Sequence, residues 1–338
     1  MKRTKLFVVV MLVVLAAGTL AAQPAAANRV VVYTPAAEEL VNILIPMFEE
    51  QTGIEVELIT AGTGELVKRV EVEQHNPYAD VFWGSNPAVM QPISHLFEEY
   101  VSSNDEFMLE QYRNLDGIYT QIAVDLHVIL LNRDLMDKLG ITVNGYADLL
   151  QPELKGKIAH GDATASSSAF LTIVNMLYSM GDRHDLMNPE AWDYIDKFLD
   201  NLDGKISSSS GVVHRSVAEG EYPVGLTWEI AALTWVVDGA PVDVIYMEEG
   251  NMSAASVAAK IENSPNPENA EKFIDFLTSE DAQKAMAQVL NRPLRAGVEL
   301  PDFMKPLDEM DSFLWDVQDV EVKKPAIQEK YIELLISK

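Results

Sequence analysis

The chain of 338 residues has a formal net charge of −27, contains 48% hydrophobic residues and has no cysteine. This composition is that of a folded, soluble protein, and the length is sufficient for two domains. The strong acidity argues against nucleic-acid partners, because phosphate contacts need clustered Lys and Arg. The lack of cysteine excludes disulfides, thiolate metal sites and cysteine nucleophiles.

The N-terminus has the layout of a secretory signal peptide. A basic start is followed by an unbroken apolar run over 6–17 and by small residues over 25–27. The alternative is a membrane anchor, but a spanning helix needs about 20 apolar residues. We expect cleavage near Ala27 or Ala22, which leaves an exported, periplasmic protein. Cleavage after Ala27 also removes three basic residues and makes the formal charge −30.

The first hundred residues alternate between strand and helix patterns. The predicted strands and helices, in order, are a strand over 29–33, a helix over 38–51, a strand over 54–58, a helix over 64–74 and a strand over 79–83. Such alternation predicts a largely parallel sheet, whose ligands bind at the carboxyl ends of the strands. The polar residues that follow those strands are Thr34, Thr63 and Ser85.

The remaining sequence continues this pattern without a linker or an internal repeat. The later predicted strands lie over 120–131, 157–160, 222–226 and 242–246, and the helices over 170–180, 191–202, 212–219, 267–278, from 280 and over 327–336. Because no Pro-rich or Gly-rich linker separates two halves, we expect several strands to join the two domains.

The turn over 162–168 places four hydroxyls, Thr164, Ser166, Ser167 and Ser168, where a strand gives way to an apolar helix. The N-terminus of a helix has unpaired N–H groups and a partial positive charge. Added hydroxyls make this a neutral cradle for phosphate or carboxylate. The alternative is simple capping, but four hydroxyls exceed the need of one cap.

Weaker candidates follow the same logic. Thr63 and Ser209 each precede or open a predicted helix, and His214 lies in the first turns of the helix after Ser209. A lone histidine is more often structural or exposed, so its functional interpretation rests on its neighbours. Glu229 ends a predicted strand, where its carboxylate can bind ligand hydroxyls or an amine, or simply cap the next helix.

Two questions stay open from the residues alone. Trp83 and Trp228 can either stack on a ligand or lie in the core. No nucleophile elbow, zinc-protease motif or phosphate-binding loop occurs, so an enzyme is unsupported. The sequence likewise indicates no metal site and no cofactor.

The order of these segments resembles the periplasmic solute-binding proteins of ABC importers, in the branch of ferric-iron, aminoethylphosphonate and sugar-phosphate binders. The matching segments span most of the chain and are Val31–Thr34, Thr63–Leu66, Ala79–Gly84, Asp162–Ser168, Gly220–Thr227 and Ser264–Ala270. The resemblance implies an α/β fold of two lobes, with mixed, mostly parallel sheets joined by crossing hinge strands. It places 28–124 and 252–338 in lobe 1, and 125–251 in lobe 2, after a signal peptide over 1–27.

The resemblance also bears on the ligand. Iron-binding members have an adjacent pair of tyrosines shortly after the strand that here ends at Thr227, whereas this chain has Trp228, Glu229, Ile230 and Ala231. That departure argues against direct iron binding, while the hydroxyl-rich turns favour an oxyanion. We therefore expect a phosphorylated or phosphonate solute, with a sugar phosphate favoured.

The expected mechanism is capture without reaction by a monomer that delivers its solute to a membrane permease. His214 with Glu229 resembles the polar pair of sugar-phosphate binders and is expected to hold the end of the ligand away from the oxyanion. The alternatives are a ferric-iron or ferric-chelate binder, a ligand-sensing module for a receptor kinase, and an exported phosphate-ester hydrolase. The residues expected to hold the oxyanion are Thr34, Thr63, Ser85, Thr164, Ser166, Ser167, Ser168 and Ser209.

Overall fold

The computed structural model describes residues 28–114, 116–207 and 209–338. The predicted signal peptide over 1–27 lies outside this part. The strands of this part are β1 (Arg29–Thr34), β2 (Glu55–Thr60), β3 (Val81–Ser85), β4 (Phe97–Glu98), β5 (Thr120–Asn132), β6 (Ile158–Ala159), β7 (Val224–Trp228), β8 (Val242–Ile245), β9 (Asn251–Ile261), β10 (Arg292–Pro293) and β11 (Ser312–Leu314).

All the predicted helices are present, but α11 begins earlier than predicted, and α3, α4 and α8 were not predicted. They are α1 (Glu38–Thr52), α2 (Thr63–Glu73), α3 (Pro87–Met90), α4 (Arg133–Leu139), α5 (Ser167–Ser179), α6 (Pro189–Leu202), α7 (Ser210–Ala218), α8 (Glu229–Val237), α9 (Pro267–Leu277), α10 (Glu280–Gln288) and α11 (Val317–Ile336). Short 3₁₀ helices lie at Gln91–Leu96, Asp105–Phe107, Glu110–Tyr112, Ala147–Leu150, Pro152–Leu154 and Leu307–Glu309. Among the described helices, none combines the length and the apolar character that a membrane span requires.

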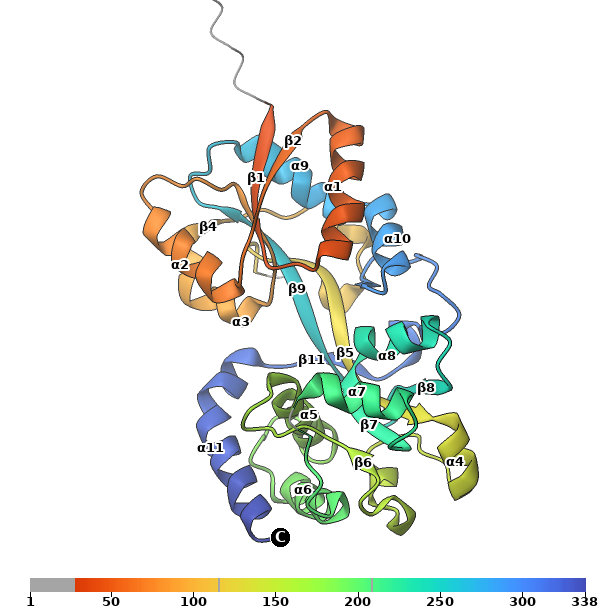
Figure 1. The fold of residues 1–338 in the computed structure, drawn as a ribbon. Helices are drawn as coiled ribbons and strands as arrows, with labels where there is room; N and C mark the ends of the chain where they lie inside the picture. The colour runs from red at the N-terminus through yellow and green to blue at the C-terminus, as the bar shows by residue number, and fades with distance from the viewer. Residues whose placement is uncertain (1–27, 115, 208) are drawn as a thin grey trace, which may run out of the picture.

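Two lobes are joined by the long strands β5 and β9, which run through both of them (Figure 1). The strand order is β2-β1-β3-β9-β5-β7-β6, with short strands added at β5 and β9. β1 is parallel to β2 and β3, β6 is parallel to β7, and β9 is antiparallel to both β3 and β5. This mixed two-lobe α/β architecture confirms the predicted fold class. The expectation of mostly parallel sheets is wrong, because the crossing strands β5 and β9 pair mainly antiparallel with their neighbours.

The upper lobe in Figure 1 packs α1, α9 and α10 on one face of β1–β3. Phe48 of α1 meets the ring of Phe273 of α9 edge-on at 5.0 Å, and Trp83 of β3 meets the same ring at 5.9 Å. Trp83 is fully buried in this cluster. The question left open for Trp83 is therefore resolved in favour of the core.

The lower lobe has its main core between the sheet and α5, α6 and α11. The C-terminal helix α11 differs from the division expected from the sequence, which placed all of 252–338 in the upper lobe. Val320, Ile327 and Tyr331 of α11 are buried in the lower-lobe cluster, and Figure 1 shows the helix alongside α5 and α6. The apolar face of α11 therefore packs against the core of the lower lobe. The proposed boundaries at 124/125 and 251/252 fall inside β5 and β9, the strands that cross between the lobes.

Candidate functional site

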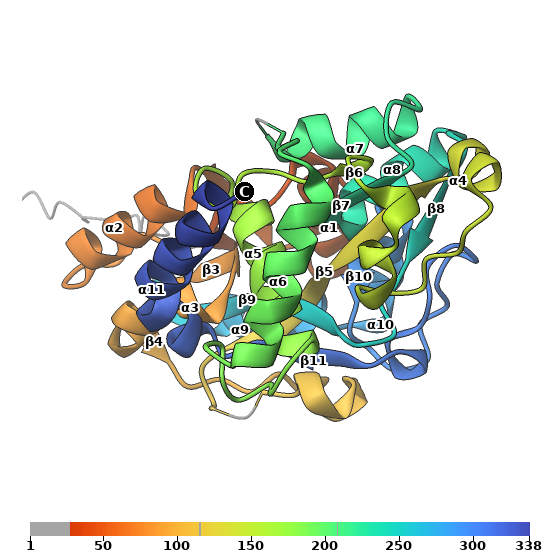
Figure 2. The ribbon, with the colours of Figure 1, turned by 90° about the horizontal axis from the view of Figure 1, so that it is seen from below.

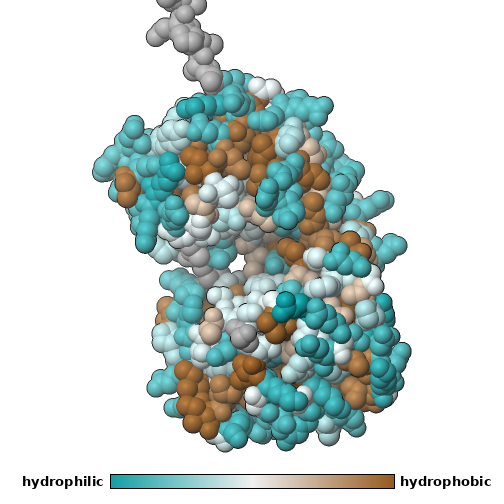
Figure 3. All heavy atoms as spheres, in the orientation of Figure 1, coloured by the Kyte–Doolittle hydropathy of each residue, from teal (hydrophilic) through white to brown (hydrophobic). Residues whose placement is uncertain are grey.

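The carboxyl ends of the parallel strands of both lobes face each other across the hollow between the lobes (Figures 1 and 3). From above come the ends of β1, β2 and β3, and from below the ends of β6 and β7. Helices α1, α2, α5 and α8 begin just after those strands, and α7 begins after Ser207, which forms a parallel bridge with Gly161 just beyond β6. Their N-termini therefore lie at the cleft, as the position of ligands in α/β sheets predicts.

In the upper lobe, Thr34 and Ser85 end neighbouring strands but differ in their hydrogen bonds. Thr34 is buried, and its Oγ1 accepts the backbone N–H of Ala36 at 3.0 Å, so this hydroxyl shapes the turn after β1. Ser85 is 5% exposed, and its Oγ has no partner among the described residues. Gly84, which directly precedes Ser85, has φ 101°, and an added Cβ would lie 3.2 Å from Thr34 Oγ1. The close approach of these two turns therefore requires a glycine.

The first turns of α1 and α2 carry no side-chain cap. The residues at the two N-cap positions are Ala37 and Gly62, and neither supplies an oxygen to the free N–H groups. Thr63, the first residue of α2, is half-buried. Two helix N-termini of the upper lobe are thus left to be satisfied by solvent or by a ligand.

The hydroxyl-rich turn before α5 divides into a structural pair and a free pair. Thr164 donates its hydroxyl to Asp162 Oδ1 at 2.7 Å, and Ser166 Oγ accepts the N–H of Ala169 as the N-cap of α5. Ser167 and Ser168 form no side-chain hydrogen bond within the described residues. Two of the four predicted hydroxyls are consequently engaged in forming the turn, and two remain at the N-terminus of the helix.

The N-terminus of α7 is arranged similarly. Ser209 is an exposed N-cap residue whose side chain makes no capping bond. Nδ1 of His214 accepts the indole N–H of Trp235 at 2.8 Å, which places the proton of a neutral ring on Nε2. Burial and the neighbouring Arg215 lower the pKa of His214, so the ring is neutral at pH 7. His214 therefore presents an N–H donor.

Glu229 is engaged inside the protein rather than presented to the cleft. Its carboxylate is 0% exposed, accepts Nε–H of Arg292 at 2.9 Å and a second bond from Nη2, and accepts the hydroxyl of Tyr246 at 2.5 Å. This differs from the expectation that Glu229 contacts the ligand. The partner Arg292 lies on β10, far along the chain, and no local pattern could have revealed the pair.

Asp125 was not singled out by the sequence, yet it lies at the hinge beside the start of α8. Its carboxylate accepts the N–H groups of Leu126 and Ile230. Burial and the nearby Glu229 carboxylate raise the pKa of Asp125 to about 8. Asp125 is thus largely protonated at pH 7 and holds a hydroxyl proton to donate. As one of 52 acidic residues, it carries no sequence signal.

A pair of buried histidines lies under the start of α5. His127 hydrogen-bonds Thr172 at 3.0 Å, and its ring centroid lies 3.8 Å from that of the half-buried Trp228. Burial lowers the pKa of His127 to about 3 and that of His160 to about 4, so both rings are neutral. Trp228, at the carboxyl end of β7, therefore packs against a neutral ring. Across the described ranges, no three His, Asp or Glu side chains form a metal-binding group.

A comparison with known protein families identifies the family to which this chain belongs. The family model described as bacterial extracellular solute-binding protein matches residues 44–311. The chain belongs to this family. Members bind a solute for transport and are not enzymes, as the sequence predicted.

Named relatives agree with this assignment. A probable ABC transporter periplasmic-binding protein of Sinorhizobium fredii is 26% identical over 79% of this chain and 74% of its own length. The periplasmic binding protein AfuA from Actinobacillus pleuropneumoniae, solved with fructose-6-phosphate, has a TM-score of 0.68 at 21% identity, covering 91% of this chain and 98% of that one. A Bordetella ferric binding protein has a TM-score of 0.73 at 21% identity, covering 90% and 98%.

These matches show the fold and the transport class. The protein is a periplasmic-type solute-binding protein of an ABC importer, which implies a permease partner and a small solute.

Proposed function

We propose that the transported solute is a small phosphorylated molecule, with a sugar phosphate favoured over a phosphonate. The observation that carries this proposal is the convergence of free helix N-termini on the cleft from both lobes. α1 and α2 lack side-chain caps, and α5 and α7 begin with hydroxyls that the fold does not use. Such N-termini bind anions through N–H groups and the helix dipole.

The oxyanion would be held by a reduced set of the predicted residues. Ser85, Ser167 and Ser168 have hydroxyls that are free within the described residues, and Thr63 and Ser209 lie at exposed or half-exposed helix starts. The formal charge of the whole chain acts weakly on this site, because the screening length at physiological salt is about 8 Å. Hydrogen bonds made at contact distance therefore decide whether an anion binds.

The rest of the solute would meet a different surface. Trp228 offers a half-buried ring, His214 offers its Nε2–H, and Asp125 offers a protonated carboxyl. A sugar ring stacks its C–H face on an aromatic ring and pairs its hydroxyls with such polar groups. In this proposal Asp125, rather than Glu229, binds the end of the ligand away from the oxyanion. AfuA, bound to fructose-6-phosphate in its structure, supports a ligand of this class.

The test is a thermal-shift screen followed by titration calorimetry. The panel holds hexose phosphates, aminoethylphosphonate, inorganic phosphate, the free sugars and ferric citrate. A ligand at 100 times its Kd stabilises the protein by about 2.7 kcal/mol. A shift with a phosphate ester and none with its free sugar supports the proposal. A shift with ferric citrate alone would favour the alternative of a ferric-chelate binder. The structural similarity to a Bordetella ferric binding protein is consistent with that alternative.

Two variants in the same turn sharpen the test. Ser168→Ala removes a free hydroxyl and should weaken binding of the phosphate ester by about 1.5–3 kcal/mol, the typical loss for a hydrogen bond to a charged group. Ser166→Ala removes the α5 cap and should lower stability by about 1 kcal/mol with a smaller effect on affinity. Unchanged affinity in Ser168→Ala would exclude its hydroxyl from the site.

A further inference from the structure

An open pocket lies on the upper lobe, on the other side of the crossing strands from α7. Its walls come from the segment 106–113, from the start of α10 and from the loop 295–297 after β10. In Figure 2, α7 lies on one side of β5 and α10 on the other. The pocket has a volume of about 460 Å³, which is within the usual range for a small-molecule site. It is therefore separate from the cleft and large enough for a small ligand.

Two arginines in this pocket lack the carboxylate partner that most arginines of the chain have. The described part of the chain contains eight arginines, and five of them form an ion pair with Asp or Glu. The other three are Arg113, Arg215 and Arg295, and Arg113 and Arg295 both line this pocket. Since acidic residues outnumber basic ones by 52 to 25, carboxylates are not scarce. Two unpaired guanidinium groups in one pocket point to an anionic ligand.

Arg295 is held in place and keeps one edge of its guanidinium free. Its Nη1 donates to Oδ1 of Asn104 at 3.2 Å and to the carbonyl of Thr278 at 2.9 Å. The guanidinium carbon lies 4.5 Å from the centre of the Phe107 ring. Nε and Nη2 donate to no described residue. Because the Nε–Nη2 edge of an arginine matches the two oxygens of a carboxylate, Arg295 is arranged to bind a carboxylate through two hydrogen bonds.

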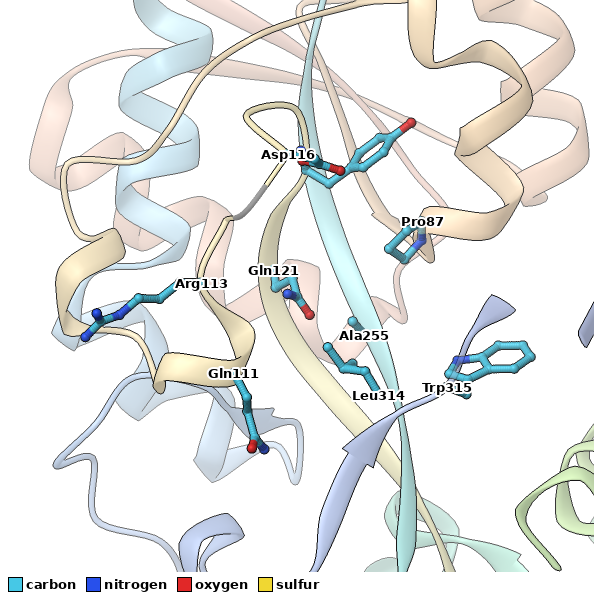
Figure 4. A pocket seen from close by; sticks show the side chains of 9 residues that line it. Pro87, Gln111, Arg113, Asp116, Gln121, Ala255, Leu314 and Trp315 are labelled. Atoms are coloured by element: carbon cyan, nitrogen blue, oxygen red, sulfur yellow. The ribbon is translucent and has the colours of Figure 1, made fainter. Parts of the chain in front are cut away.

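Arg113 is held through the opposite edge of its guanidinium. Its Nε donates to the carbonyl of Met108 at 3.2 Å, and its Nη2 donates to the carbonyl of Glu106 at 2.8 Å. Figure 4 shows that this side chain points away from Gln121 and from the pocket drawn there. Met108 also pairs with Arg295 in an antiparallel bridge, so both arginines are anchored to one segment. The Nη1 of Arg113 donates to no described residue and is left for a second acid group.

The acidic residues of the pocket do not cancel the two positive charges. The carboxylate of Glu280 is paired with Lys284 at 2.5 Å. Glu106 is exposed, and its carboxylate pairs with no described residue. Two guanidinium groups thus share the pocket with a single uncompensated carboxylate. The local charge is positive, although the chain as a whole is strongly acidic.

The remaining wall is partly apolar. Phe107 is 47% exposed, and Ala296 lies in the same wall. A molecule with an acid group at each end of a short carbon chain matches these features, because each acid group meets one guanidinium and the chain lies against Phe107 and Ala296. We propose that this pocket is a second binding site, separate from the cleft, for a small dicarboxylate.

The test is titration calorimetry with succinate and inorganic phosphate as probes. Wild-type protein should bind succinate more tightly than phosphate. Arg295→Gln should weaken succinate binding about tenfold, because a bidentate, charge-assisted pair is lost, and Arg113→Gln should weaken it about fivefold. Arg215→Gln is the matched control, because Arg215 also lacks an ion-pair partner among the described residues but does not line this pocket. It should bind succinate like wild type.

A variant with increased affinity keeps the test informative if loss of an arginine disturbs the loop. Glu106→Gln removes the one uncompensated carboxylate at an exposed position. It should leave thermal unfolding unchanged and tighten succinate binding about twofold to fivefold at low ionic strength. A structural role of the arginines alone would not produce this gain.

Four outcomes would overturn the proposal. If succinate does not bind the wild type, the pocket takes no dicarboxylate. If phosphate binds there more tightly than succinate, the proposed class of ligand is wrong. If Arg215→Gln weakens succinate binding as much as Arg295→Gln, the attraction is a general effect of charge. If Ser168→Ala weakens succinate binding and Arg295→Gln does not, the anion occupies the cleft. Since Ser168→Ala tests the phosphate ester in the cleft, the two proposals fail independently.

Discussion

The two buried histidines of the lower lobe make stability depend on pH in a defined direction. Burial lowers the pKa of His127 to about 3 and that of His160 to about 4. In the unfolded chain a histidine has a pKa of about 6.5. Below that pH the unfolded chain binds more protons than the native protein, so the free energy of unfolding falls as the pH falls.

The size of the effect follows from the same values. A pH of 5 lies about 1.5 units below the pKa of a histidine in the unfolded chain, whereas the native ring stays neutral at this pH. At about 1.4 kcal/mol per unit, each histidine removes about 2 kcal/mol of stability between pH 7 and pH 5. Asp125 acts in the opposite direction, because its native pKa of about 8 exceeds the unfolded value of about 3.9. Folding then takes up a proton, and acid favours the native state.

The assay must therefore compare variants. Urea unfolding at pH 7 and pH 5 is measured for wild type, His127→Gln and the exposed-site control His184→Gln. Wild type and His184→Gln should lose about 2 kcal/mol more on acidification than His127→Gln. The contribution of Asp125 is common to all three proteins and cancels. Equal losses in the three proteins would refute the assignment of His127 as a buried neutral group.

Two further predictions concern packing and charge. Glu229→Gln should cost about 3–5 kcal/mol in urea unfolding, because it leaves Arg292 buried without its carboxylate, and adding Arg292→Met should recover part of that loss. If Glu229→Gln instead abolished solute binding at unchanged stability, the carboxylate would belong to the ligand. Gly225→Ala places a Cβ 2.7 Å from Val217 and should cost about 1–3 kcal/mol in thermal unfolding. Gly211→Ala, which meets open space, should be neutral or stabilising by up to about 1 kcal/mol, and equal effects of the two would contradict this account.

The sequence predicts regular, amphipathic elements well and misses elements whose signal is not local. The helix over 38–51 and the strand over 120–131 were found within a residue or so, because their apolar spacing is strong. β9 was not predicted, because its sequence from Asn251 to Ile261 is rich in Ala and Ser, which have little strand preference. α11 begins at Val317 rather than near 327. Pro325 lies inside this helix, and a proline in a sequence ordinarily marks a helix boundary.

The candidate site shows the same limit. Position at strand ends points to Ser85 and to the start of α5, because topology brings such ends to one cleft, and their contact with a ligand remains a prediction. The roles of individual side chains depended on contacts across the chain. Arg292 comes from β10 to bind Glu229, and Trp235 of α8 donates its indole N–H to His214 of α7. Such pairs cannot be read from spacing alone.

The position of β9 has a consequence for the order in which the chain can fold. β9 lies between β3 and β5 in the sheet, and Val81 pairs with Lys260. A chain that emerges from its N-terminus has β1, β2 and β3 long before β9, so the inner edge of β3 stays unpaired until most of the sequence is available. Contacts this distant in sequence slow folding, and an unpaired edge invites pairing with other chains. The same strand that joins the lobes is therefore the last essential piece of the upper sheet, and truncation before residue 251 should leave a chain that cannot complete it.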